Sequence, residues 1–191
     1  IAKEGEALGS SSFSEIILCL PGDTKNAHLK SNFDLIDAGM DVVRSHQFIM
    51  LAGSEAATKE SREKYGMITR FRVTPKTVVP YTLFGNTFFA PEIDEICVAN
   101  NSMSFEDYLE CRTFNLTVEI FYNNGILYEL IKFLKLRQIK ISLFIKEIHE
   151  QIHTQHSHLT AVYKSFLKET NELWESKKSV EIFLESQDVL K

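Results

Sequence analysis

The amino-acid sequence predicts an α/β protein: a partial TIM-type barrel of parallel βα units with a β flap, followed by an α-helical carboxyl-terminal region. Two short apolar, β-forming segments, 15–19 and 42–50, are each followed by a turn and a polar helical pattern. Consecutive βα units of this kind give parallel strands. From Ser104 onward, apolar residues recur at helical spacing. We therefore expect two parts, a partial barrel with its flap over 1–102 and a helical region over 103–191.

The first βα unit contains the predicted site. Its strand stops at Pro21 and Gly22, where the backbone can turn sharply and approach a ligand closely. Thr24 is the expected N-cap of the following helix, whose amino end offers free backbone N–H groups. Because barrel enzymes place their sites at the carboxyl ends of strands, we expect binding residues in 18–24 and in 46–54. Pro, Gly and a capping residue also serve turns that bind nothing.

The remaining elements are predicted from local signals. Helices are expected over 25–38 and up to Tyr65, aromatic-rich strands of a hairpin or flap over 68–73 and 78–89, and a short strand over 92–98. In the helical region we expect an N-cap at Ser104, an interruption at Asn123-Asn124-Gly125, and breaks near Ser157 and Ser176.

Composition narrows the classes of function. The chain has 191 residues, 44% of them hydrophobic, and a formal net charge of −5. It can therefore bury a core, and it favours neither nucleic acid nor an anionic membrane as a partner. No apolar run approaches the roughly 20 residues that span a bilayer. Three widely spaced cysteines, Cys19, Cys97 and Cys111, argue against a disulfide framework and favour the cytoplasm. Cys19 reads as a small buried hydrophobe or, less commonly, as a reactive thiol.

The first strand and its turn carry a family resemblance. Residues 19–24 read Cys-Leu-Pro-Gly-Asp-Thr and resemble the GLPGDT segment in the second half of the barrel of radical S-adenosylmethionine enzymes. The similarity is greatest to the branch that often carries a cobalamin-binding domain. Further similar segments follow in order over roughly residues 1 to 130: Asp37–Met40, Leu51–Glu55, Ser61–Met67, Phe71–Val73, Glu92–Val98 and Ser104–Tyr108. The chain departs from the family at Cys19, where glycine is usual, at Ala52, where proline is usual, and in lacking a CxxxCxxC motif.

The resemblance implies a cofactor site. In the family, a hydrophobic residue of the first strand packs on the adenine of S-adenosylmethionine, and Ile17 takes that place here. A residue near the end of the next strand approaches the nucleoside, and Gln47 is the nearest polar candidate. With Pro21 and Gly22, these are the expected cofactor-binding residues. The full-length enzyme would also hold a [4Fe–4S] cluster and, in this branch, cobalamin. The resemblance thus implies the carboxyl-terminal part of a radical enzyme with a small-molecule substrate, inactive alone because the cluster cysteines are absent.

An incomplete barrel also predicts a partner. Its sheet edges leave backbone hydrogen-bonding groups unpaired, and such edges pair readily with another chain. We expect pairing with the missing amino-terminal half of the same barrel, or self-association. The segment that starts at Ile1 reads like the end of a helix, so we expect a longer protein before it.

A second motif points to a different class of protein. Residues 149–153 read His-Glu-Gln-Ile-His, an HExxH sequence in which His149 and His153 share a helix face beside Glu150 as a potential base. Glu172 lies downstream at a distance similar to that of the third zinc ligand of gluzincin peptidases. The isoleucine stripe of this helix puts the histidines on a partly solvated flank, however, and no substrate-binding strand is predicted nearby. A zinc-dependent hydrolase is therefore the alternative function, and a non-catalytic helical interaction module within 126–191 is the third.

Overall fold

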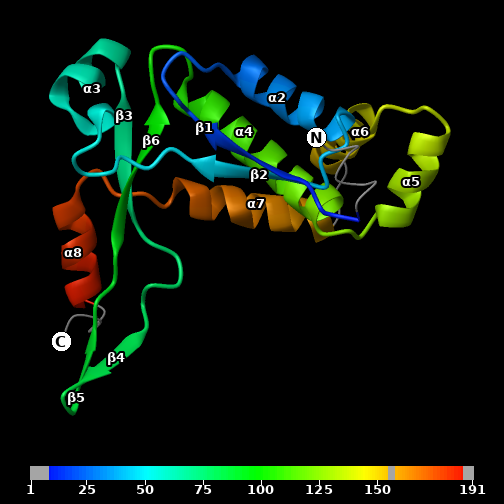
Figure 1. Cartoon of the computed structure of the whole chain (residues 1–191). Helices are drawn as coiled ribbons and strands as arrows, with labels where there is room; N and C mark the ends of the chain where they lie inside the picture. Colours follow the sequence, from blue (N-terminus) through cyan, green and yellow to red (C-terminus); the bar gives the residue numbers. More distant parts are fainter. Residues whose placement is uncertain (1–8, 155–157, 187–191) are drawn as a thin grey trace.

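The computed structural model describes residues 9–154 and 158–186 (Figure 1). Its strands are β1 (Phe13–Leu18), β2 (Val42–Gln47), β3 (Ile68–Val73), β4 (Pro80–Leu83), β5 (Asn86–Phe89) and β6 (Ile93–Ala99). Its α-helices are α2 (Lys25–Asp37), α3 (Lys59–Tyr65), α4 (Phe105–Val118), α5 (Tyr128–Leu136), α6 (Ile141–Thr154), α7 (His158–Asn171) and α8 (Lys177–Ser186). Figure 1 shows the β4–β5 hairpin at one end of the molecule, far from α2 and α6.

The sheets are short and do not close into a barrel. β1 and β2 pair in parallel, from Phe13 opposite Val42 to Leu18 opposite Gln47, and α2 connects them. β3 pairs with β6 and β4 with β5, both antiparallel, so each sheet of the described residues has two strands. The predicted partial TIM-type barrel is therefore wrong.

The residues after β2 explain this difference. Phe48 C=O accepts a hydrogen bond from Cys97 N–H at 2.9 Å, and Met50 N–H donates to Glu95 C=O at 2.8 Å. The segment after β2 thus bridges to β6 in the antiparallel sense and does not extend the parallel pairing of β1 and β2. Apolar periodicity predicted an extended segment over 42–50 but carries no information on the direction of its partner.

Side-chain capping starts two of the helices where the sequence predicted. Thr24 Oγ1 accepts a hydrogen bond from Ala27 N–H at 3.2 Å at the start of α2. Ser104 and Asp107 form a reciprocal capping box at the start of α4. These contacts satisfy N–H groups that a helix start otherwise leaves without partners.

The carboxyl-terminal region is mostly helical. α4 continues into a π-helical turn, Glu119–Asn123, and the chain then reverses near Gly125 before α5. The predicted break near Ser176 separates α7 from α8, whereas the one predicted near Ser157 lies outside the described residues. No helix among the described residues combines the length and apolar character needed to cross a bilayer.

Two clusters of buried side chains form the core. The first joins β1, β6 and α4: Leu18, Cys19, Met50, Ile96, Cys97, Val98, Met103, Tyr108 and Cys111. The second joins α2, β2, α4, α5 and α6: Ile36, Val43, Phe114, Val118, Tyr122, Ile131, Ile141 and Ile145. Both clusters contain residues from 1–102 and from 103–191. The expected division of the chain at residue 102 stays a prediction.

The segment between α7 and α8 is tied to the edge of β3. Trp174 N–H donates to Phe71 C=O at 2.9 Å, and Phe71 N–H donates to Trp174 C=O at 2.8 Å. This reciprocal bridge covers part of a strand edge that would otherwise be open, and it holds α8 beside the β3–β6 sheet (Figure 1).

Candidate functional site

The two faces of the β1–β2 sheet differ in their cover. Residues paired across parallel strands share a face, and neighbours along a strand alternate between faces. Ile17 pairs with His46, whereas Leu18 pairs with Gln47. The structure therefore places Ile17 and Gln47, two of the predicted cofactor-binding residues, on opposite faces of the sheet.

The face that carries Ile17 is uncovered by the described residues, and we call it the open face. It consists of the exposed residues Phe13, Glu15, Ile17, Arg44 and His46 together with the half-buried Val42. Ile17 is 42% exposed. His46 Nε2 lies 2.9 Å from Glu15 Oε1, so two polar side chains of the open face are hydrogen-bonded to each other. The sequence placed His46 within the expected binding range 46–54, but strand alternation identifies its face only once the register is known.

The opposite face is covered by helices α2 and α4. Leu18 and Val43 are buried there. The Gln47 amide donates to the Tyr108 hydroxyl and accepts from Arg72. Gln47 is therefore held in a polar network on the helix side, with no access to the open face, and its predicted role toward the nucleoside stays a prediction.

Hydrogen bonds from the Asn100 side chain hold the turn after β1. Cys19 has φ +73°, a left-handed conformation that glycine adopts at low cost. The Asn100 side-chain amide donates to Cys19 C=O at 3.1 Å and to Leu20 C=O at 3.3 Å. Pro21 and Gly22 follow, half-buried and exposed respectively, and no atom lies within 4 Å of the position that a Gly22 Cβ would take. The turn therefore leaves open space for a group to approach the backbone.

The three cysteines are buried core residues. Cys19 Sγ lies 3.9 Å from Cys97 Sγ, and Cys111 belongs to the same cluster. The hydrogen bond with Cys97, together with burial, raises the pKa of the Cys19 thiol, and burial raises the pKa of Cys111 to about 12. These two thiols are therefore protonated and inaccessible at neutral pH. Within the described residues, no three His, Cys, Asp or Glu side chains are grouped to hold a metal.

The HExxH helix is α6, and its described members already have partners. His149 Nδ1 lies 2.6 Å from Thr117 Oγ1, and the His149 ring meets Phe114 edge-on at 5.3 Å. Glu150 pairs with Lys146 at 3.6 Å, and Glu172 pairs with Lys168 at 4.0 Å. The side chain of His153 lies outside the described residues. The described residues therefore do not assemble the predicted zinc site.

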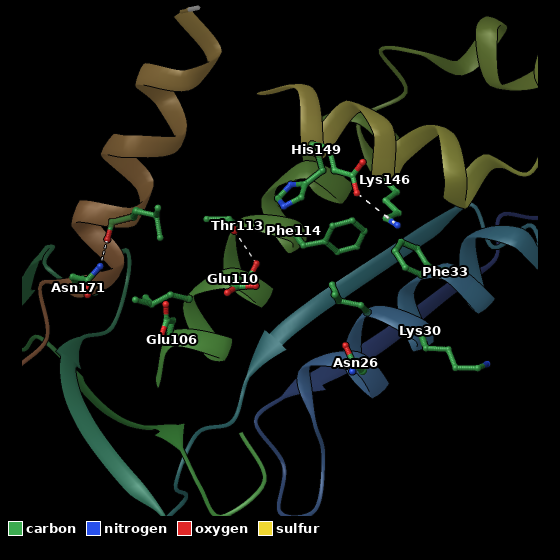
Figure 2. A pocket seen from close by; sticks show the side chains of 14 residues that line it. Asn26, Lys30, Phe33, Glu106, Glu110, Thr113, Phe114, Lys146, His149 and Asn171 are labelled. Carbon is green, nitrogen blue, oxygen red and sulfur yellow. Dashed lines mark hydrogen bonds and ion pairs between the residues drawn. The ribbon is translucent and has the colours of Figure 1, made fainter. Parts of the chain in front are cut away.

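A cavity of about 730 Å³ lies beside this helix, between α2, α4, α6 and α7 (Figure 2). Figure 2 shows Phe33 from α2, Phe114 from α4 and His149 from α6 facing one another in it. Its charged lining residues are exposed: Lys30, Glu106, Glu110, Lys146 and Glu150. The cavity combines an apolar interior with a rim of both charges, so it selects no ligand class by charge.

A second cavity, of about 770 Å³, lies on the helix-covered side beyond the end of β2. Gln47, Arg72 and Arg112 line it together with Trp174. Sequence reasoning missed both arginines, because α4 and β3 are brought together only in the fold.

Comparisons with known proteins leave the family open. No model of a protein family matches the chain, and no curated protein matches it either.

Proposed function

We propose that this chain is the carboxyl-terminal part of a radical S-adenosylmethionine enzyme and that its open face completes the nucleoside side of the cofactor site. One observation supports this above the others: Ile17, the residue that the resemblance assigns to the adenine, is exposed on an uncovered sheet face directly before a turn. An exposed isoleucine in a strand offers apolar surface that an adenine ring can cover and remove from water.

The backbone of the turn supports the same proposal. Cys19 stands where the family has glycine, and its φ of +73° is the conformation that glycine favours. The resemblance thus extends from residue types to a backbone requirement at the same position. The open space at Gly22 allows the ligand to approach the chain closely.

The iron–sulfur cluster does not fit the described cysteines, which are buried and not grouped as metal ligands. The cluster ligands, and cobalamin if the branch resemblance holds, would belong to another part of the longer protein. In the family, reductive cleavage of S-adenosylmethionine at the cluster supplies a 5′-deoxyadenosyl radical. The role proposed for this chain is to seat the nucleoside and to shape access for a small-molecule substrate.

The proposed partner is the rest of the same enzyme, which would cover the open face. Phe13 and Ile17 on this face are 61% and 42% exposed, and apolar surface of this kind promotes association. In the absence of the rest of the enzyme, the open face favours self-association. We place the protein in the cytoplasm because its three cysteines are free and buried, as is usual in a reducing compartment.

The first experiment is to sequence the coding region upstream of Ile1. The proposal expects an in-frame CxxxCxxC motif in the coding region before Ile1. A start codon directly before Ile1 would overturn the proposal.

The second experiment measures the role of the open face in that full-length enzyme, reconstituted without oxygen. An Ile17→Asp substitution should raise the KM for S-adenosylmethionine about tenfold or more in a 5′-deoxyadenosine release assay, because it replaces an apolar contact with a charge. The matched control is Ile139→Asp, at an isoleucine of similar exposure, 47%, between α5 and α6. An equal rise in KM for both variants would contradict a specific role of Ile17.

A further inference from the structure

The cavity beyond the end of β2 is lined by two arginines, Arg72 and Arg112, and by two exposed glutamates, Glu169 and Glu172. It is enclosed by β3, α4, α7, α8 and the segment before α8. The residues that matter here are Gln47, Arg72, Arg112, Phe166, Glu169 and Trp174. Its volume of about 770 Å³ lies within the range of small-molecule sites.

Arg72 already has partners for its charge and its donors. Arg72 Nη2 lies 3.2 Å from Asp94 Oδ2, and Nη1 donates to the Gln47 side-chain oxygen. The Gln47 amide in turn donates to Tyr108. This chain of contacts is satisfied and fixes one wall of the cavity.

Arg112 has no such compensation. Its Nε atom is buried and has no hydrogen-bond partner among the described residues. Its guanidinium lies over the Phe166 ring, 4.9 Å from the centroid, and no ion pair among the described residues involves it. Burial lowers the pKa of Arg112, and the nearby charge of Arg72 adds to that effect. Arg112 is half-buried, and a charge that is partly withdrawn from water is ordinarily paired, because leaving it without a partner is costly.

Neither carboxylate that lines the cavity forms an ion pair with Arg112 in the described structure, and Glu172 pairs instead with Lys168 at 4.0 Å. Glu169 lines the cavity from α7 but is exposed. The opposite wall is aromatic, with the Trp174 and Phe183 rings 5.2 Å apart.

We propose that this cavity binds a small organic anion, with a carboxylate or phosphate group on Arg112 and a planar or apolar body against Trp174. A guanidinium presents parallel N–H groups that match the oxygens of either anion, and no ion pair among the described residues engages that of Arg112. The cavity adjoins Gln47, on the opposite sheet face from Ile17. The inference therefore does not depend on the proposed nucleoside role and survives its failure.

The chain has a built-in reporter for this site. It contains a single tryptophan, Trp174, so its intrinsic fluorescence can be titrated with phenyl phosphate, phenylacetate, inorganic phosphate and the neutral phenylacetamide. We expect a saturable change with phenyl phosphate or phenylacetate below about 10 mM, and none with phenylacetamide. The tighter of the two anions identifies the group as phosphate or carboxylate. Inorganic phosphate should bind more weakly, because it has no body to contact the aromatic wall.

Variants test whether Arg112 is the ligand. Arg112→Gln should weaken binding of the preferred anion about tenfold or more, since it removes a charge-assisted hydrogen bond. The matched control is Arg137→Gln, because Arg137 also stacks on a phenylalanine, Phe133, at 5.3 Å but lies outside the cavity. That control should bind as the parent does. Glu169→Gln should bind more tightly, because it removes a negative charge from the cavity lining.

Three results would overturn the proposal: no saturable change with either anion, equal binding of phenylacetamide, or an equal loss in Arg137→Gln. Far-ultraviolet circular dichroism checks that each variant is folded. If Arg112→Gln does not fold, Arg112→Lys keeps the charge but loses the paired donors, and it should still bind several-fold more weakly than the parent.

Discussion

The two faces of the β1–β2 sheet both carry large apolar side chains but have opposite surroundings. On the covered face, Leu18 and Val43 are almost completely buried beneath α2 and α4. On the open face, Ile17 directly precedes Leu18 in the chain and yet is 42% exposed. Large apolar side chains such as Phe13 and Ile17 are ordinarily buried, and here they lie exposed among charged neighbours. The comparison teaches that residues 9–154 and 158–186 cover one face only, and it is the reason we look for a ligand or partner on the other.

The largest difference between the two faces is expected when the side chains of the neighbouring residues Leu18 and Ile17 are shortened to alanine. Leu18→Ala should lower the free energy of unfolding by about 2–5 kcal/mol, because it leaves a cavity in the core. Ile17→Ala should change it by less than about 1 kcal/mol, since little of that side chain is buried. Urea unfolding of the two variants measures both values. Similar losses in the two would mean that the described residues or a second copy cover the open face.

A smaller effect is expected at Cys19, in the turn that follows β1. Cys19→Gly should be more stable than Cys19→Ala by about 1 kcal/mol, because both lose the thiol but only glycine adopts φ +73° without strain. At ordinary strand or helix positions, an alanine variant is more stable than the corresponding glycine variant. The same urea experiment provides the measurement, and alanine proving the more stable of the two would refute the assigned backbone conformation.

The third expected effect is a pH dependence on the covered side. His28 in α2 is buried, with Nε2 3.0 Å from Asn115 Oδ1, and burial lowers its pKa below the ordinary 6.5. Below that value the unfolded chain binds a proton that the folded chain resists, so the free energy of unfolding falls as the pH drops. His28→Gln should flatten this slope between about pH 7.5 and 5.5. An unchanged slope in the variant would assign the pH dependence to other groups.

Local features of the fold could be predicted from the sequence. Thr24 and Ser104 were identifiable as caps because the groups they bond lie within three residues along the chain. The pairing of strands was not local. The barrel prediction failed because the segment after β2 takes an antiparallel partner, β6, that lies far along the chain.

The candidate sites show the same limit. Ile17 and the turn at Pro21 and Gly22 could be selected from the chain alone, but their neighbour across the sheet, His46, depends on register. Arg112 gave no signal in the sequence. It became notable only because the fold buries its Nε without a partner. The HExxH sequence is the opposite case. The motif is plain in the sequence, but in the fold its first histidine, His149, lies within hydrogen-bond distance of Thr117 from a different helix.

The bridge between Phe71 and Trp174 also has a consequence for biosynthesis. The edge of β3 is closed by a segment made roughly 100 residues later, and ribosomes add about 5–20 residues per second. For about 5 to 20 s, each new molecule therefore carries this strand with an exposed edge that can pair with a neighbouring chain. The interval in which the nascent protein most needs a chaperone ends only when Trp174 has left the ribosome.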